Sequence, residues 1–422
     1  MIANIQINID GRWIDAAAYN QKDIGHIGYL EYDMDYFLSF ADKPALRVGL
    51  NYPISLSLND SDVWPAFLYD ILPSGAGRRV WLRRLGLRDN DSPSDWTLLL
   101  QGAGNPPGNL RVKSAAIVPP EKPHPGFTRE EIVDKNADFI EYAEAMGAVV
   151  AGASDVQGDA PKFLLVRDHN KRWHPDGSLF DSDILDSWIV KFPRGKDTKD
   201  YQVLRNEAGY YEVARHFGIN VGEPLYYENN ALFIPRFDRE KNGERLIRHG
   251  LESLSSAAGV PGYGKRGDHL EFCKSIAKFS TNKESDLFEY LKRDILNTAL
   301  RNTDNHGRNT AFLKRSSGDV TLSPLYDFAP MFLDPQGIAR ASIWNDEALE
   351  RKGSGRPNWK VIAEALSGLL DSEETEQFMS LQSNAVRNLP AVMKEVGIEE
   401  DVILGVKRRC EEIAEDLAMV II

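Results

Sequence analysis

The strongest constraint on the fold is a change in hydrophobic periodicity near Arg248. Before this residue, short apolar runs predict strands, among them residues 162–166 and 187–192. After it, apolar residues recur at helical spacing, as in residues 288–299. A strand-rich block followed by a helix-rich block is typical of α+β architecture. We therefore expect two lobes of one larger domain.

A proline-rich segment separates these lobes from the start of the chain. Four prolines lie between Ile117 and Phe127, a composition that favours an extended spacer. Ahead of it, short strand-like runs alternate with turns such as Asp10-Gly11, and two helical patterns follow. A further helix is expected over about 129–147. We predict four parts, namely an accessory domain at 1–116, a linker at 117–128, a strand-rich lobe at 129–248 and a helical lobe at 249–422.

The composition excludes several classes of protein. Hydrophobic residues make up 42% and charged residues 27% of the 422 residues, which is typical of a soluble globular protein. The net charge of −13 would repel a phosphate backbone, so non-specific nucleic-acid binding is disfavoured. No basic and apolar leader begins the sequence, and no window approaches the ~20 apolar residues of a membrane span. We expect a cytoplasmic protein with no membrane contact, in which Cys273 and Cys410 are core residues.

The segment TDNHGRN, residues 303–309, carries the strongest chemical signal. Phosphoryl transfer needs a carboxylate to orient the nucleophile, and an amide and a second carboxylate to hold Mg²⁺. Asn309 follows Asp304 by five residues, as in the protein-kinase catalytic loop, and Asp327-Phe328-Ala329 stands where D-F-G is expected. We predict Asp304 as the catalytic base, with Asn309 and Asp327 as Mg²⁺ ligands.

A lysine and a glutamate occur upstream in the order that a kinase requires. Lys191 lies within the apolar strand-like run Trp188–Pro193, where a charged side chain needs an anionic partner. Glu207 is the preferred partner, because Asn206 is able to cap the helix that follows and Glu207 then shares a face with Tyr211. Glu212 is the alternative. Lys191 is therefore predicted to act in catalysis, on the ATP phosphates.

A loop of small residues precedes the first of these strands. Its sequence, GASDVQGDAPK over residues 152–162, offers backbone N–H groups to phosphate oxygens. It matches neither G-x-x-x-x-G-K-[ST] nor G-x-G-x-x-G, and alone it fits an ordinary surface turn better than a phosphate-binding loop. The order of all the motifs supports a nucleotide-binding role. The predicted ATP contacts in this loop are Val156, Gln157, Gly158, Asp159 and Lys162.

Together these segments resemble the HipA family, the serine/threonine-kinase toxins of bacterial toxin–antitoxin pairs. The resemblance implies an α+β fold with a two-lobed protein-kinase-like domain, a strand-rich N-lobe and a helical C-lobe, preceded by a small N-terminal α/β domain. It also implies a kinase that uses ATP and Mg²⁺. The matching segments are Asp70–Pro73, Gly158, Lys162, Ile189–Pro193, Asn206–Glu207, Arg236–Arg239, Thr303–Asn309 and Leu322–Asp327.

The resemblance further implies partners and additional site residues. Pro235, Arg236 and Phe237 are expected at the adenine, read through backbone groups. The protein substrate is expected to be an aminoacyl-tRNA synthetase or another translation component, and the partner a small HipB-like DNA-binding antitoxin, with DNA contacted only through it. The family phosphorylates a serine in the phosphate loop. Asp155 occupies that position here and cannot accept a phosphate. Either the adjacent Ser154 is the autophosphorylation site, with a shifted loop, or control is exerted otherwise.

Two other functions remain open at this stage. Asp304, His306 and Asn309 also form the D-x-H-x-x-N pattern of phosphoinositide-type kinases, which allows a kinase for a lipid head group or a small molecule. His306 contacts ATP in this interpretation, although a structural role is slightly favoured for it. The absence of a basic amphipathic helix weakens a lipid substrate. Alternatively, Ala329 and Asp155 depart from the kinase pattern enough to allow an inactive binding module. Its arginine cluster, residues 78–84, would then contact the antitoxin or DNA instead of being a solvated helix face.

Overall fold

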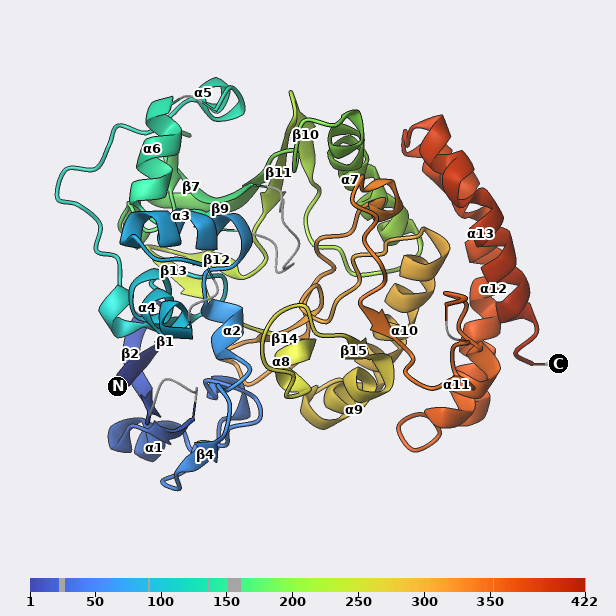
Figure 1. Cartoon of the computed structure of the whole chain (residues 1–422), viewed down its shortest axis with the longest axis horizontal. Helices are drawn as coiled ribbons and strands as arrows, with labels where there is room; N and C mark the ends of the chain where they lie inside the picture. The colour runs from blue at the N-terminus through green and yellow to red at the C-terminus, as the bar shows by residue number, and fades with distance from the viewer. Residues whose placement is uncertain (23–26, 90–91, 136, 151–160, 352, 422) are drawn as a thin grey trace. The chain divides into compact units, whose positions relative to one another are not determined.

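The computed structural model describes residues 1–22, 27–89, 92–135, 137–150, 161–351 and 353–421. The fold is mixed, with sheets and helices, and an N-terminal region rich in sheet (Figure 1). The chain forms two compact units, each built from several segments. Unit 1 comprises residues 1–195, 226–264 and 311–323, and unit 2 comprises residues 196–225, 265–310 and 324–422.

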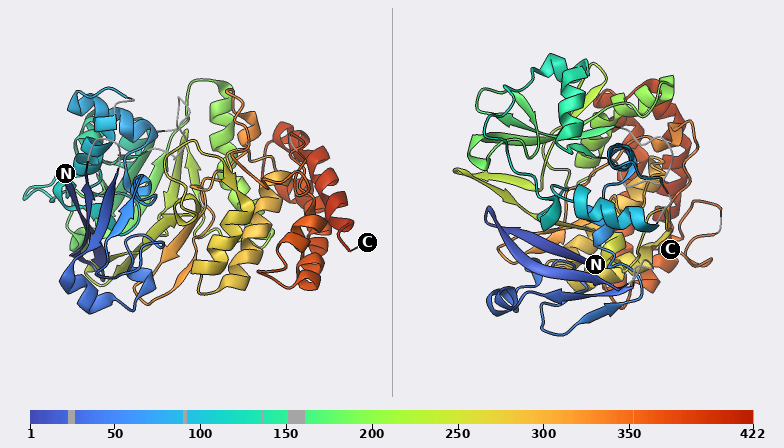
Figure 2. Two further views of the ribbon diagram at one scale, coloured as in Figure 1. Left: turned by 60° about the horizontal axis from the view of Figure 1, so that its bottom comes forward. Right: turned by 60° about the vertical axis from the view of Figure 1, so that its left-hand side comes forward.

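A five-stranded antiparallel sheet in the order β4-β3-β2-β1-β5 opens unit 1 (Figure 2). The turn at Asp10-Gly11, with φ of 49° and 81°, matches the type I′ geometry that joins two strands tightly. Alternate residues of the first strand, Ala3, Ile5 and Ile7, are fully buried. The elements are β1 Ile2–Ile9, β2 Arg12–Gln21, β3 Gly28–Tyr32, α1 Met34–Phe40, η1 Pro44–Leu46, β4 Asn59–Ser61, α2 Leu68–Ile71, α3 Gly75–Leu85, α4 Ser92–Gly102, β5 Leu110–Val112 and η2 Lys113–Ala115.

A second antiparallel sheet in unit 1 has the order β10-β11-β9-β7-β6, with β8 paired to β7. Its core, which includes Phe163 and Phe233, is separate from the core of the first sheet. The single helix expected over 129–147 is wrong, because Lys135, with φ of 51°, interrupts it. The elements are α5 Arg129–Val133, α6 Ala137–Ala145, β6 Val149–Val150, β7 Lys162–Asp168, β8 Trp173–Pro175, η3 Asp181–Asp183, β9 Ile184–Lys191, β10 Tyr226–Glu228 and β11 Ala231–Pro235.

Short strands that follow β11 complete unit 1. Three of these strands lie beyond Arg248, where helical periodicity dominates the sequence, because strands of three or four residues leave little periodic signal. A buried ion pair joins Lys314 to Glu252 at 2.9 Å, and the Glu252 carboxylate also accepts the N–H of Leu50. The elements are β12 Arg239–Asn242, β13 Arg245–Arg248, β14 Gly250–Ser253, α8 Leu254–Ala257, β16 Ala311–Lys314 and β17 Val320–Leu322.

Unit 2 is mainly helical. The last two long helices, α12 and α13, lie side by side in Figures 1 and 2, and Cys410 on α13 is buried, as is Cys273 on α9, which confirms their expected place in the core. None of the helices in the described ranges is long and apolar enough to cross a membrane. The elements are α7 Thr198–His216, β15 Gly267–Asp268, α9 His269–Phe279, α10 Lys283–Ala299, η4 Met331–Leu333, β18 Ser342–Ile343, α11 Trp359–Ala365, α12 Ser372–Glu395 and α13 Glu400–Ala418.

Helix α7 begins earlier than the sequence suggested. Asp197 caps it, and Asp200 completes a capping box by accepting the backbone N–H of Asp197 at 3.1 Å. The predicted cap, Asn206, lies inside the helix and donates to the Gln202 carbonyl oxygen at 2.8 Å. The prediction for Asn206 is therefore wrong, because the reciprocal bonds of the earlier capping box satisfy the helix N-terminus.

Candidate active site

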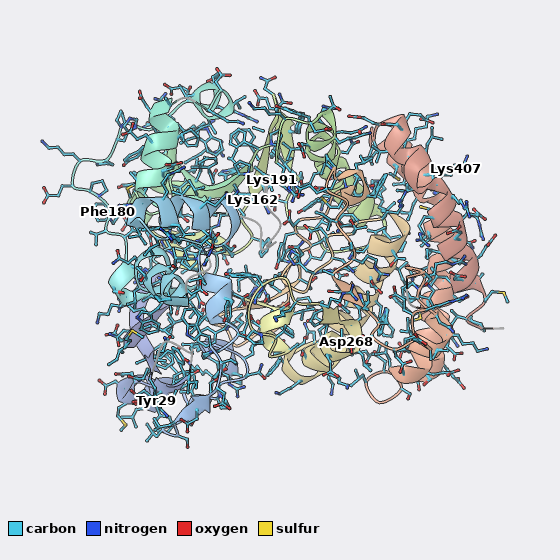
Figure 3. All side chains as sticks on the ribbon, viewed as in Figure 1. Tyr29, Lys162, Phe180, Lys191, Asp268 and Lys407 are labelled. Carbon is cyan, nitrogen blue, oxygen red and sulfur yellow. The ribbon has the colours of Figure 1, made fainter. Side chains whose placement is uncertain are left out.

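Two lysines lie opposite each other at one end of the second sheet of unit 1. Lys162 begins β7 and Lys191 ends β9, and the antiparallel register pairs them directly (Figure 3). Lys191 is only 7% exposed, and Leu232 of β11 lies on its other side. Two cationic side chains at facing positions attract anions to the same place. This sheet end therefore suits the binding of an anionic group such as a phosphate.

The strand ladder continues past both lysines. The N–H of Phe192 donates to the Pro161 carbonyl oxygen at 3.0 Å, so the chain just before Lys162 is held beside β9. The loop that precedes Pro161 contains most of the predicted phosphate contacts. Those residues lie outside the described part of the chain, namely Ser154, Asp155, Val156, Gln157, Gly158 and Asp159.

The segment after β11 is held by buried charges. The Arg236 guanidinium donates to Asp176 at 2.5 Å and to Asp238 at 2.8 Å, and Asp238 also accepts the N–H of Gly108 at 2.7 Å. The N–H of Arg236 donates to the Ser187 carbonyl oxygen at 3.0 Å. Breaking such a buried pair typically costs about 3–5 kcal/mol. The Arg236 side chain is thus structural, and backbone contacts of Pro235, Arg236 and Phe237 with adenine stay a prediction.

In unit 2, three predicted residues converge within one short loop after α10. The Asn309 side-chain amide donates to the backbone oxygen of Asp304 at 2.8 Å, and the Asn309 N–H donates to the His306 carbonyl oxygen at 2.8 Å. His306 Nε2 lies 3.5 Å from Asp304 Oδ1. The Asp304 side chain is 15% exposed, so it is still reachable by a substrate. The loop therefore presents one carboxylate, one imidazole and one amide together.

The second predicted metal ligand, Asp327, has an unusual backbone. Its φ is 55°, in the left-handed region that non-glycine residues enter rarely and often at functional sites. The next residue, Phe328, is buried and its ring centroid lies 5.4 Å from that of Tyr210 on α7. Helix α7 therefore packs directly against the Asp-Phe-Ala segment.

The same helix places Tyr211 near both Glu207 and Asp327. Burial raises the pKa of Tyr211 well above its ordinary value, and the nearby carboxylates of Glu207 and Asp327 raise it further. Glu207 is fully buried, whereas the alternative, Glu212, pairs with Arg215 at 3.2 Å near the surface. The contacts of α7 therefore favour Glu207 over Glu212 as a site residue.

The donor chemistry of these residues fits a magnesium nucleotide. Mg²⁺ usually keeps water and substrate phosphates and takes only one or two protein oxygens, so Asn309 and Asp327 suit it. The described residues contain no cluster of three or more His, Cys, Asp or Glu that could hold a metal ion unaided. Mg²⁺ that is bound together with phosphate does not need such a cluster. The paired lysines, Lys162 and Lys191, suit the phosphates.

Sequence reasoning missed one feature in each of the two sets of candidate residues. The direct opposition of Lys162 and Lys191 depends on strand register, which a single sequence does not reveal. The helix contact with Asp-Phe-Ala, made by Tyr210 and Tyr211, has a partial signal, since both residues lie on the buried face of α7 beside Glu207.

Comparisons with known proteins place the chain in a family. The model of the HipA-like C-terminal domain matches residues 154–393, which is more than half of the chain. The protein therefore belongs to the HipA-like C-terminal domain family, and the resemblance seen in the sequence is confirmed.

Two curated relatives come from Sinorhizobium fredii. "Putative kinase Y4mE" is 25% identical over 282 residues, covering 62% of this chain and 63% of that protein's length. "Putative kinase Y4dM" is 22% identical over 388 residues, covering 83% and 85%. Among solved structures, a chain from the complex of the Shewanella oneidensis MR-1 toxin–antitoxin system HipA, HipB and its operator DNA aligns over 99% of both chains, with a TM-score of 0.69 and 17% identity. This likeness confirms the α+β fold.

Proposed function

We propose that the protein is an ATP-dependent serine/threonine kinase, which transfers the γ-phosphoryl group of Mg·ATP to a hydroxyl of another protein. The arrangement of Asp304, His306 and Asn309 carries this proposal, because the Asn309 amide fixes the backbone of the catalytic carboxylate. The family match and the kinase names of the two relatives support it.

Each residue has a defined role in this proposal. Asp304 accepts the proton of the acceptor hydroxyl and orients that hydroxyl for in-line attack. Lys191 and Lys162 bind phosphate oxygens, with Glu207 as the proposed partner of Lys191. Asn309 and Asp327 provide oxygen ligands for Mg²⁺, which, when bound, offsets charge on the phosphates. Most of the acceleration then comes from positioning and electrostatic stabilisation.

We further propose that the kinase acts as a toxin controlled by a small DNA-binding antitoxin in the cytoplasm. The solved neighbour is described as a complex of HipA with HipB and operator DNA, which supports a partner of that kind. The substrate is proposed to belong to the translation machinery. Phosphorylation there would restrain growth, so expression without the antitoxin should slow growth in a manner that depends on Asp304.

The central test is a phosphosite map. The purified protein is incubated with Mg·ATP and a cell extract, and new phosphosites are compared with those made by Asp304→Asn. Loss of the base should reduce transfer by about 10²–10⁴-fold while the thermal unfolding midpoint stays close to that of the unmodified protein. Equal phosphorylation by the Asp304→Asn variant would refute the proposal.

The same samples resolve two remaining questions. Mass spectrometry of the enzyme itself shows whether Ser154 is phosphorylated. Addition of labelled ATP to a lipid extract tests the alternative acceptor class, which the closeness of His306 to Asp304 keeps in play. Label in lipid with none in protein would replace a protein acceptor by a lipid one.

A further inference from the structure

The residue after the catalytic carboxylate makes an unusual set of contacts. Asn305 is buried, at 8% exposure, and its side-chain amide bonds the backbone of a distant segment. Its Nδ2 donates to the Ser342 carbonyl oxygen at 3.0 Å. Its Oδ1 accepts the N–H groups of Ala341 at 3.1 Å and Ser342 at 3.2 Å. One side chain thus uses both donor and acceptor to hold two consecutive residues.

The segment that Asn305 holds, residues 340–344, is anchored on its other side as well. Ser342 and Ile343 form β18, which pairs with β15, and the Gly267 N–H donates to the Ala341 carbonyl oxygen at 2.9 Å. The Trp344 indole donates to the buried Asp294 of α10 at 2.8 Å. These contacts fix the segment to β15 and α10, while Asn305 fixes it to the catalytic loop.

Charge adds a further restraint at the start of this segment. Arg340 donates to Glu350 at 2.7 Å and lies 3.7 Å from Asp294, with its side chain 15% exposed. Residues 335–337 and Ala339, just before it, are exposed. The segment bonded to the catalytic loop is therefore preceded directly by an exposed stretch of chain.

The position of Asn305 next to Asp304 indicates which substrate the bonds to residues 341 and 342 affect. A proton acceptor must lie about 2.6–3.2 Å from the hydroxyl it deprotonates, so the acceptor molecule must pass close to Asp304. The predicted nucleotide ligands are Lys162, Lys191 and Asp327, together with His306 and Asn309 of the same loop as Asn305, and none of them lies in residues 340–342. The segment that Asn305 bonds therefore carries no predicted nucleotide ligand, and its link to the immediate neighbour of Asp304 places it to act on the acceptor.

We propose that Asn305 is a positioning residue for the acceptor: it holds residues 340–342 in register with Asp304, and so sets where the acceptor hydroxyl meets the carboxylate. This inference rests on the proposed kinase function. Asn305 itself does not touch the reacting atoms. Its loss should leave the nucleotide in place and misplace the acceptor, and displacements of about 1 Å are known to cost up to roughly 10²-fold in rate.

The test compares Asn305→Ala and Asn305→Asp with a matched control, Asn302→Ala. Asn302 is a buried amide of the same loop that bonds the Asn297 side chain at 2.8 Å, so its loss reproduces the removal of a loop hydrogen bond. Transfer from Mg·ATP to total extract protein is measured while either ATP or the extract is varied. Asn305→Ala should raise the apparent KM for extract protein about tenfold and leave the KM for ATP unchanged, and Asn302→Ala should shift neither. Equal shifts in both KM values, or none, would overturn the proposal.

Hydrogen exchange gives a second readout that needs no activity. In Asn305→Ala the amides of Ala341 and Ser342 lose their acceptor and should exchange faster. Asn305→Asp keeps an acceptor oxygen and should restore protection at both amides. Unchanged exchange in Asn305→Ala would show that Asn305 does not hold the backbone of Ala341 and Ser342. If the unmodified protein transfers no phosphate in an Asp304-dependent way, the proposed kinase function is wrong. Faster exchange in Asn305→Ala would still show that Asn305 holds residues 341 and 342.

Discussion

The two sets of candidate site residues are placed by different kinds of backbone. In unit 1, Lys162 and Lys191 lie on adjacent strands of a regular ladder, so their opposition follows from register. In unit 2, Asp304 and Asn309 lie in an irregular loop that follows Arg301, whose φ is 55°, and Asp327 shares the same left-handed conformation. Side-chain contacts hold that loop, including the bond from Asn309 to the Asp304 carbonyl oxygen.

This difference separates two kinds of sensitivity. A lysine on a strand can lose its charge while the ladder around it stays intact, since backbone bonds define its position. A loop residue such as Asn309 both supports the backbone and serves the proposed chemistry. Substitutions in unit 2 should therefore damage function through position as well as chemistry, whereas those at the unit 1 lysines should act through charge alone.

The largest effect is expected at Asn309. Asn309→Asp keeps an oxygen for Mg²⁺ but loses the donor that fixes Asp304, and Asn309→Ala loses both. We expect roughly 10³-fold lower kcat for Asn309→Ala, within the range for removal of a preorganised electrostatic group. Asn309→Asp should retain only part of that activity if the amide bond matters. Rates are measured over a range of Mg²⁺ concentrations. Full activity of Asn309→Asp would mean that the loop does not need this bond, and the contrast with unit 1 would fail.

A smaller effect is expected from the lysines. Lys191→Met should raise the KM for ATP and lower kcat, by about 10²-fold in kcat/KM, because Lys191 is buried and a desolvated charge acts strongly. Lys162→Met should cost less, about tenfold, since this lysine is only half-buried and solvent weakens its charge. Neither change should lower the thermal unfolding midpoint appreciably.

The control for both lysines is Lys171→Met, in the exposed turn after β7. It removes the same charge from a turn next to the same sheet and should leave the KM for ATP unchanged. If all three variants weaken ATP binding equally, general charge and not the cross-strand pair would explain the result. A marked fall in stability for Lys191→Met would show that this strand position is not independent of its side chain.

Much of the ladder was predictable from the sequence. Apolar β-type runs located β7 and β9, and the motif order located Asp304, Asn309 and Asp327, because both signals are local. The start of α7 was also readable in principle, since Asp197 and Asp200 stand at the spacing of a capping box. The prediction placed the helix start at Asn206 instead, because asparagine is also a favoured N-cap residue.

Other features depend on long-range contacts. The facing of Lys162 and Lys191 is set by register, and the bonds of Asn305 to Ala341 and Ser342 join loops far apart in the sequence. The break at Lys135 reflects a positive φ that its residue type does not signal. Local pattern thus locates the chemical groups, while tertiary structure decides which of them meet.

The buried His269 contacts both helix α10 and the backbone of Ser342, which Asn305 also bonds. His269 Nδ1 lies 2.6 Å from the Tyr290 hydroxyl, and Nε2 lies 3.3 Å from Asp294. Burial lowers the pKa of His269, the Asp294 carboxylate opposes this, and the Arg340 guanidinium adds to it. Contact with the backbone of Ser342 and the charge of Asp268 act in the same direction as Asp294. The net result is a pKa below the ordinary value.

The smallest effect is expected on the pH dependence of the unfolding free energy, through His269. Because the folded pKa of His269 is lowered, the unfolded chain binds more protons as pH falls below the ordinary value of about 6.5, and stability decreases. His269→Gln should be less stable at pH 7.5 yet lose less of its unfolding free energy than the unmodified protein on going to about pH 5.5. Urea unfolding at both pH values measures this. An equal loss in His269→Gln and the unmodified protein would show that this histidine does not set acid stability, because the proton uptake would then belong to other groups.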